Sequence, residues 1–215
     1  MLNSFRFYFT VLFVVTASVG IAQKPAQSFG IKAGLNVPGV NYVPVINPTS
    51  LPGFHAGLLF TPPRAGIFGY HTELVFSREG YHFRTSTSKG KVQTDYLLLP
   101  QLMTINLGPL IQLQVGGQLA FLIGGNADST SSNPSSVPDP TGYGKVSDYF
   151  NRIKYGFVGG LEINPVGGYI LGGRYNFNMG SINKQQPSGP LPPYFPKSGE
   201  EMKMHLIQLY IGYFF

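Results

Sequence analysis

The residues of this sequence that could do chemistry are few, and they centre on two histidines and one glutamate. His71 and Glu73 lie two residues apart, so they share one face of a strand, and His55 lies on the preceding segment. Imidazole and carboxylate groups on one face could hold a metal ion or form an acid–base pair. The pattern places no third metal ligand, so we favour a polar network inside the fold over a metal or acid–base site.

Motifs for other chemistries are missing from the sequence. It has four histidines, no cysteine and no GxSxG segment, which leaves no nucleophile with a partnered base. The glycine pairs at 116–117, 159–160 and 172–173 lack the spacing of nucleotide-binding loops. We therefore expect no enzyme activity, no cofactor and no metal site.

The C-terminal segment 202–215, MKMHLIQLYIGYFF, indicates the kind of strand that would position His55, His71 and Glu73. Every second residue from Ile207 to Phe215 is apolar or aromatic, while the residues between them are mixed and include Gln208 and Gly212. A period of two is typical of a strand with one apolar face. In water, an apolar terminal strand would be an exposed, aggregation-prone sheet edge. It can instead close a barrel whose outer face contacts lipid.

The same alternation recurs along the chain and predicts eight strands. Three short turns and four longer connections (38–52, 78–90, 124–151 and 180–201) separate them, a pattern typical of outer-membrane barrels. We expect a bulge or kink at Pro100, which cannot donate to the ladder. The fold class is thus an all-β, eight-stranded, antiparallel, transmembrane up-and-down barrel, with strands over 29–37, 53–61, 67–77, 91–105, 110–123, 152–163, 169–179 and 202–215.

Composition separates this barrel from a soluble one. Only 11% of the residues are charged, 14% are aromatic, and there are 28 glycines and 18 prolines. A lipocalin-like barrel would also have about eight strands, but it would turn its apolar face inward around a ligand. Here the second face is polar, so the apolar face should be the outer one.

The N-terminal residues indicate export. Arg6 precedes an apolar run from 7 to 19, and small residues follow up to Ala22, as in a cleaved secretory signal; an uncleaved anchor is the alternative. We expect a signal peptide at 1–22, a short lead at 23–28 and a barrel domain at 29–215 in the outer membrane of a Gram-negative cell. The net charge of +6 is scattered, so we expect no nucleic-acid partner.

Several short motifs resemble the PorT-like outer-membrane β-barrels, a porin-related family of Bacteroidota. They are GIKAGLN at 30–36, ELVFSREG at 73–80, DYLLLP at 95–100 and the terminal Phe215. The resemblance covers essentially the whole mature chain and implies an outer-membrane barrel without assigning an activity. The terminal aromatics Tyr213 and Phe215 also resemble the signal read by the barrel-assembly machinery.

Inward-facing charges are the candidate site of this barrel. Counting from the turns places Lys32, His55, Glu73 and Arg174 at mid-barrel depth, with Glu162 nearer the turns and Lys154 nearer the loops. An unpaired charge in a narrow lumen is costly, so Glu73 and Glu162 should pair with basic groups. We expect a small structural or interaction barrel in outer-membrane lipid, with an extracellular or periplasmic protein partner. A narrow channel or secretion accessory is the alternative, ahead of a barrel enzyme. The predicted lumenal network comprises Lys32, His55, His71, Glu73, Lys154, Glu162 and Arg174.

Overall fold

The computed structural model describes residues 28–41, 47–62, 66–85, 88–131, 144–145, 147–164, 167–183 and 202–215. The expected signal peptide at 1–22 and residues 23–27 lie outside this part of the chain. No helix within the described ranges is long and apolar enough to cross a membrane.

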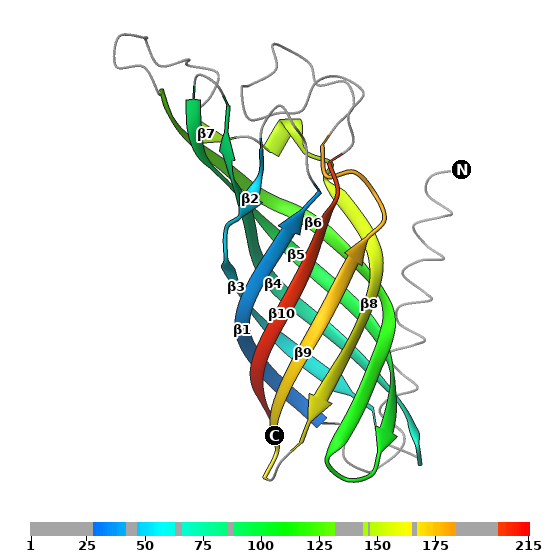
Figure 1. The fold of residues 1–215 in the computed structure, drawn as a ribbon. Coiled ribbons are helices and arrows are strands. Elements are labelled where there is room, and N and C mark those ends of the chain that lie inside the picture. Colours follow the sequence, from blue (N-terminus) through cyan, green and yellow to red (C-terminus); the bar gives the residue numbers. More distant parts are fainter. Residues whose placement is uncertain are drawn as a thin grey trace, which may run out of the picture.

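Eight long antiparallel strands form a closed ring in chain order (Figure 1). β10 pairs with β1 and β4 pairs with β5, which closes the ring and leaves no free long edge among the described strands. The short strands β2 (Thr49–Ser50) and β7 (Gly144–Lys145) extend the sheet at the loop end, next to the 3-10 turn η2 (Ser147–Tyr149). The ring strands are β1 (Ser28–Val40), β3 (Gly53–Thr61), β4 (Phe68–Arg84), β5 (Ser88–Leu107), β6 (Ile111–Ser131), β8 (Ile153–Ile163), β9 (Tyr169–Asn178) and β10 (Met204–Phe214).

The strands are strongly staggered around the ring. The Cα pairs that start at Phe29 and pass once around all eight strands return to β1 at Gly39, ten residues further along. Such a stagger tilts the strands, and eight strands enclose only enough room for side chains. The barrel is therefore narrow, as the sequence predicts.

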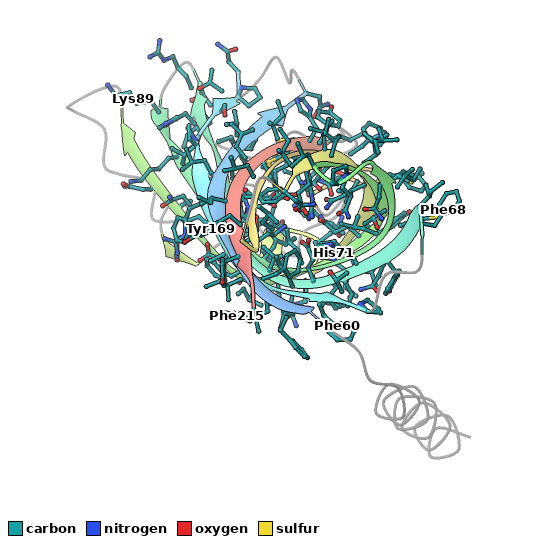
Figure 2. All side chains as sticks on the ribbon, turned by 90° about the horizontal axis from the view of Figure 1, so that it is seen from below. Phe60, Phe68, His71, Lys89, Tyr169 and Phe215 are labelled. Atoms are coloured by element: carbon teal, nitrogen blue, oxygen red, sulfur yellow. The ribbon has the colours of Figure 1, made fainter. Side chains whose placement is uncertain are left out.

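Apolar side chains cover the outside of the ring and polar ones fill the inside. On β8, the outward Tyr155 and Phe157 are 55% and 60% exposed, whereas the inward Lys154 and Glu162 are 2% and 0% exposed. This arrangement confirms the predicted polarity and is the reverse of a soluble ligand-binding barrel. Viewed from the turn end, Phe60, Phe68 and Tyr169 lie on the outside of the ring (Figure 2).

Three predicted loops are partly strand, so the predicted strand ends were wrong. β4 continues to Arg84, β5 begins at Ser88 and β6 continues to Ser131, inside the expected loops 78–90 and 124–151. β1 likewise runs to Val40. The β6 extension is rich in glycine and serine, and the outward residues of the β4 extension are not apolar, but ladder pairing continues both strands, with Arg84 still opposite Lys89.

The loop end of the barrel contains a hydrophobic cluster of its own. Along β4 and β5 the alternation inverts, with apolar side chains now inward and charged ones outward. The inward side chains pack with residues of η2 and of the connections around β9 and β10. This cluster closes the barrel at that end, and its buried members are Tyr81, Phe83, Val92, Ala127, Phe150, Ile182, Met202 and Met204.

Pro100 interrupts a ladder without producing the predicted bulge. The β4–β5 ladder is interrupted between the pairs Thr72–Gln101 and Val75–Leu98, beside the proline. The register is the same on both sides of the interruption. The register shift of β5 lies elsewhere, against β6 between Asp95 and Tyr96.

Candidate functional site in the barrel lumen

The structure places all seven side chains of the predicted lumenal network inside the ring. Lys32 comes from β1, His55 from β3, and the others from β4, β8 and β9, each on the inward phase of its strand. Each residue is at most 3% exposed. His71 lies inside the ring in the view along the barrel (Figure 2). Their contacts divide them into three groups.

Glu73 is the centre of the first group. Its Oε2 accepts hydrogen bonds from Lys32 Nζ at 2.6 Å and from Arg174 Nη1 at 2.7 Å, and its Oε1 accepts one from Arg174 Nη2 at 2.6 Å. His71 Nε2 lies 3.4 Å from Oε1. The Lys32, His71 and Glu73 side chains are fully buried and that of Arg174 is 1% exposed. Strands from opposite parts of the sequence thus meet at one carboxylate.

Tyr210 packs against both cations of this group. Its ring centroid lies 4.5 Å from Lys32 Nζ and 4.8 Å from Arg174 Cζ, within the range of cation–π attraction. Arg174 Nε also donates to Gln114 Oε1 at 2.7 Å. The Arg174 guanidinium is therefore held by a carboxylate, an amide and an aromatic face, which fixes its position across the lumen.

Glu162 does not pair with a base as the sequence analysis expected. Its Oε2 accepts hydrogen bonds from Gln114 Nε2 and Tyr210 Oη, both at 3.0 Å, and no salt bridge to Glu162 occurs within the described ranges. The Arg174 guanidinium bonds to Glu73 and Gln114 instead. Two neutral donors therefore bond to one oxygen of this carboxylate, and its Oε1 has no hydrogen-bond partner among the described residues.

Lys154 pairs with Glu79, which lies within the predicted loop 78–90 but belongs to β4 in the structure. Lys154 Nζ donates to Glu79 Oε2 at 3.0 Å and lies 3.5 Å from the centroid of the Tyr96 ring. Ser77 Oγ donates to Glu79 Oε1 at 3.2 Å. Every second residue of β4 from Glu73 onward faces inward, and Glu79 is one of them. Continuing this alternation past Ser77 could therefore have identified Glu79 as the partner of Lys154.

His55 belongs to a separate amide layer toward the loop end. Its Nδ1 lies 2.8 Å from Asn36 Oδ1, which also accepts a hydrogen bond from Gln208 Nε2 at 3.1 Å. Asn36 Nδ2 donates to Ser77 Oγ at 2.9 Å. His55 therefore does not converge with His71 and Glu73. Within the described residues, no group of three or more His, Cys, Asp or Glu side chains could hold a metal ion.

Apolar side chains lie beyond the charges at both ends of the lumen. Leu59 and Ile170 pack with Tyr210 and Phe214 at the turn end, where the His71 ring lies 5.7 Å from that of Phe214. The Tyr81–Phe83 cluster lies at the loop end. Apolar clusters thus lie at both ends of the charged layer, and the turn end also contains buried polar groups such as Glu162 and Gln112. The charged groups of the layer mainly contact one another.

The terminal aromatics lie at the seam where the last strand meets the first. Phe215 N donates to Phe29 O at 2.7 Å, and the Tyr213 ring lies 5.0 Å from that of Tyr169 and 5.5 Å from that of Phe215. The Phe215 side chain is on the outside of the ring and is 76% exposed (Figure 2). Both residues therefore lie on the outer face of the barrel at this seam.

Comparisons with known proteins found several solved structures and one family model. Solved structures with a related arrangement include Ail, the attachment invasion locus protein of Yersinia pestis (16% identity, 89% of this chain and 100% of that chain, TM-score 0.48). OprG of Pseudomonas aeruginosa (13% identity, 88% and 96% covered, TM-score 0.46) and Neisserial surface protein A (12% identity, 87% and 97% covered, TM-score 0.48) also match. No curated protein matches the sequence. The family model of the outer membrane protein beta-barrel domain matches residues 21–184, so the chain belongs to this outer-membrane family.

Proposed function

We propose that this protein is a small structural or interaction barrel of the outer membrane, with a closed lumen and a loop end that faces the outside of the cell. The observation that carries the proposal is the Glu73 group. Three charge-assisted hydrogen bonds join it to Lys32 and Arg174, and the whole group is buried. A dissolved ion that crossed the lumen would have to separate these charges in a poorly hydrated space, which is costly.

The proposed role is non-enzymatic, because Lys32 and Arg174 pair with Glu73, Lys154 pairs with Glu79, and all five residues are buried. His55 bonds to Asn36, whereas His71 lies beside Glu73, so the polar groups do not form an acid–base pair around an open space. A narrow channel is the second candidate, and the density of charge in the lumen is the observation that favours it. An open water path through the charged layer would decide for the channel.

We further propose that the chain is PorT-like, on the motifs GIKAGLN and DYLLLP, and that it is exported by a cleaved signal at 1–22. N-terminal sequencing of membrane-fraction protein should then begin at Gln23, whereas protein that still carried Met1 would contradict the cleavage. In outer-membrane barrels the short turns face the periplasm, so the ends of β4, β5 and β6 would be outside.

The proposed partners follow from the surfaces. The apolar outer face would contact outer-membrane lipid, and Tyr213 with Phe215 would engage the barrel-assembly machinery during biogenesis. A protein partner would bind at the loop end or the periplasmic turns, and no nucleic acid is proposed.

Liposome swelling combined with copurification tests this function. Liposomes that contain the folded barrel should swell in a small sugar no faster than protein-free liposomes, and native outer membranes should yield a specific partner. If these liposomes swelled as fast as liposomes that contain a known general porin, the closed barrel would be wrong and the protein would be a channel.

A further inference from the structure

The outward face of the β4–β5 hairpin carries a cluster of basic side chains beyond the apolar belt. His82 and Arg84 of β4 and Lys89 and Lys91 of β5 are all exposed there. They line one groove of about 570 Å³, and Asp128 of β6 is the acidic residue that lines it with them. We call these four basic residues the rim cluster.

The strand register sets the basic groups directly opposite one another. His82 pairs with Lys91, and Arg84 pairs with Lys89. Like charges directly opposite each other destabilise a sheet, so the Arg84–Lys89 pair is unfavourable without an anion between its two charges. Asp128 Oδ2 lies 4.0 Å from Lys91 Nζ and is 67% exposed, so it offsets one of the three formal positive charges. The groove keeps an excess of positive charge at its wall.

The position of the rim cluster relative to the membrane follows from the outward residues below it. On β4 the last outward apolar residue is Phe76, and the first outward charge is Arg78, which forms a bidentate pair with Asp95 of β5. Each further residue rises about 2.5 Å along the membrane normal at the usual strand tilt. His82 is therefore about 10 Å and Arg84 about 15 Å above this boundary, beyond a phospholipid headgroup layer that is about 5–7 Å thick.

The hairpin also leans away from the barrel axis. Seen along the barrel, Lys89 lies well outside the ring, over the area that surrounding lipid occupies (Figure 2). In Figure 1 the ends of β5 and β6 extend to the upper left, past the ring. The rim cluster thus faces the surface of the surrounding leaflet rather than the mouth of the lumen.

We propose that the rim cluster binds the phosphate groups on the saccharide of the lipopolysaccharide molecules that surround the barrel. Ammonium and guanidinium groups form charge-assisted hydrogen bonds with phosphate, and a phosphate between opposite cations would remove their repulsion. The height of the cluster matches a glycolipid headgroup, which is thicker than that of a phospholipid. The proposal uses the outward orientation given under "Proposed function", but it is independent of whether the lumen conducts.

The test measures binding of fluorescent rough lipopolysaccharide to the full mature barrel in a non-ionic detergent at low salt. A basic residue near an anionic surface contributes about 5-fold in affinity, so Lys89→Ala with Lys91→Ala should raise Kd about 25-fold. Dephosphorylated lipopolysaccharide should bind the wild type as weakly as intact lipopolysaccharide binds the double variant. Asp128→Asn should lower Kd.

The matched control removes two exposed cations from the same end of the barrel, Arg152 before β8 and Lys203 before β10. The double variant Arg152→Ala with Lys203→Ala carries the same net charge as the rim variant, and its Kd should stay within about 2-fold of the wild type. Heat-modifiable migration on gels verifies that each variant is folded.

Three results would overturn the proposal: equal loss of affinity in both double variants, wild-type affinity in the rim variant, or unchanged binding after dephosphorylation. Dextran sulfate that bound more tightly than lipopolysaccharide through the same lysines would also overturn it, in favour of a site for soluble polyanions. None of these outcomes bears on the closed lumen, which permeability measurements test separately.

Discussion

Replacing Glu73 by alanine should strongly destabilise the barrel. The substitution leaves the Lys32 ammonium and the Arg174 guanidinium buried without their carboxylate, and both make contacts of 2.6–2.7 Å to it. Side chains that are 0% and 1% exposed receive no compensation from water in the folded state. Removing one partner of such a pair costs about 3–5 kcal/mol of unfolding free energy.

The Arg78–Asp95 pair provides a control of the same chemistry. Its Arg78 Nε–Asp95 Oδ1 distance is 2.7 Å, but its side chains are 38% and 20% exposed. Water can solvate the group that remains, so Asp95→Ala should cost about 1 kcal/mol or less. The comparison isolates burial as the cause of the larger effect.

Urea titration in lipid vesicles would measure both variants. The chain contains no tryptophan, so the folded fraction is read from heat-modifiable gel migration or from β-sheet circular dichroism. For an m value of about 2 kcal/mol/M, Glu73→Ala should lower the midpoint by about 2 M. The double variant with Arg174→Ala should be destabilised by less than the sum of the single variants. An unchanged midpoint in folded Glu73→Ala protein would refute the buried, charge-paired arrangement.

Two further substitutions and one deletion test other parts of the structure. Lys154→Met leaves the Glu79 carboxylate buried without its cation and should cost about 3–5 kcal/mol in the same urea titration. Deletion of Phe215 removes the outward aromatic at the closing seam and should reduce the amount of folded, heat-modifiable barrel in cell membranes. Gly172→Ala places a methyl group in the space of the Tyr210 ring and should cost about 1–3 kcal/mol, read from the unfolding midpoint.

Each of these has a matched control. Adding Glu79→Leu to Lys154→Met removes both charges and should restore much of the stability. Gly159→Ala puts a methyl group where no atom lies within 4 Å, so its midpoint should stay near the wild type. Phe215→Tyr keeps the terminal aromatic and should assemble normally. Equal effects in the test and control variants would show that charge pairing, ring overlap or the terminal aromatic is not the cause.

The strands and their faces could be predicted because the membrane enforces a regular pattern. Lipid selects apolar residues at every second position, so segments such as Ile153–Ile163 are unambiguous. The extensions of β4, β5 and β6 lie beyond the lipid, where outward residues are polar and the pattern inverts. Tyr81 and Phe83 alternate with the basic residues His82 and Arg84, but here the apolar residues face inward. This alternation was the signal for the part of β4 that the prediction missed.

The identity of the lumenal residues could be predicted, but not their pairing. Inward phase follows from alternation alone, and it places Glu73 and Arg174 inside. Their contact joins residues 101 positions apart, and it depends on the stagger accumulated over several strands, which no local pattern contains. For the same reason, Glu162 was expected beside a base but accepts hydrogen bonds from an amide and a phenol.

Single-channel recording in planar lipid bilayers tests the closed lumen most directly. Folded wild-type barrel, verified by heat-modifiable migration before insertion, should give no stable current steps at either polarity, because the Glu73, Lys32 and Arg174 side chains occupy the lumen between the apolar clusters at its two ends. Long-lived, ohmic current steps that scale with the KCl concentration would contradict this account and identify the barrel as a channel.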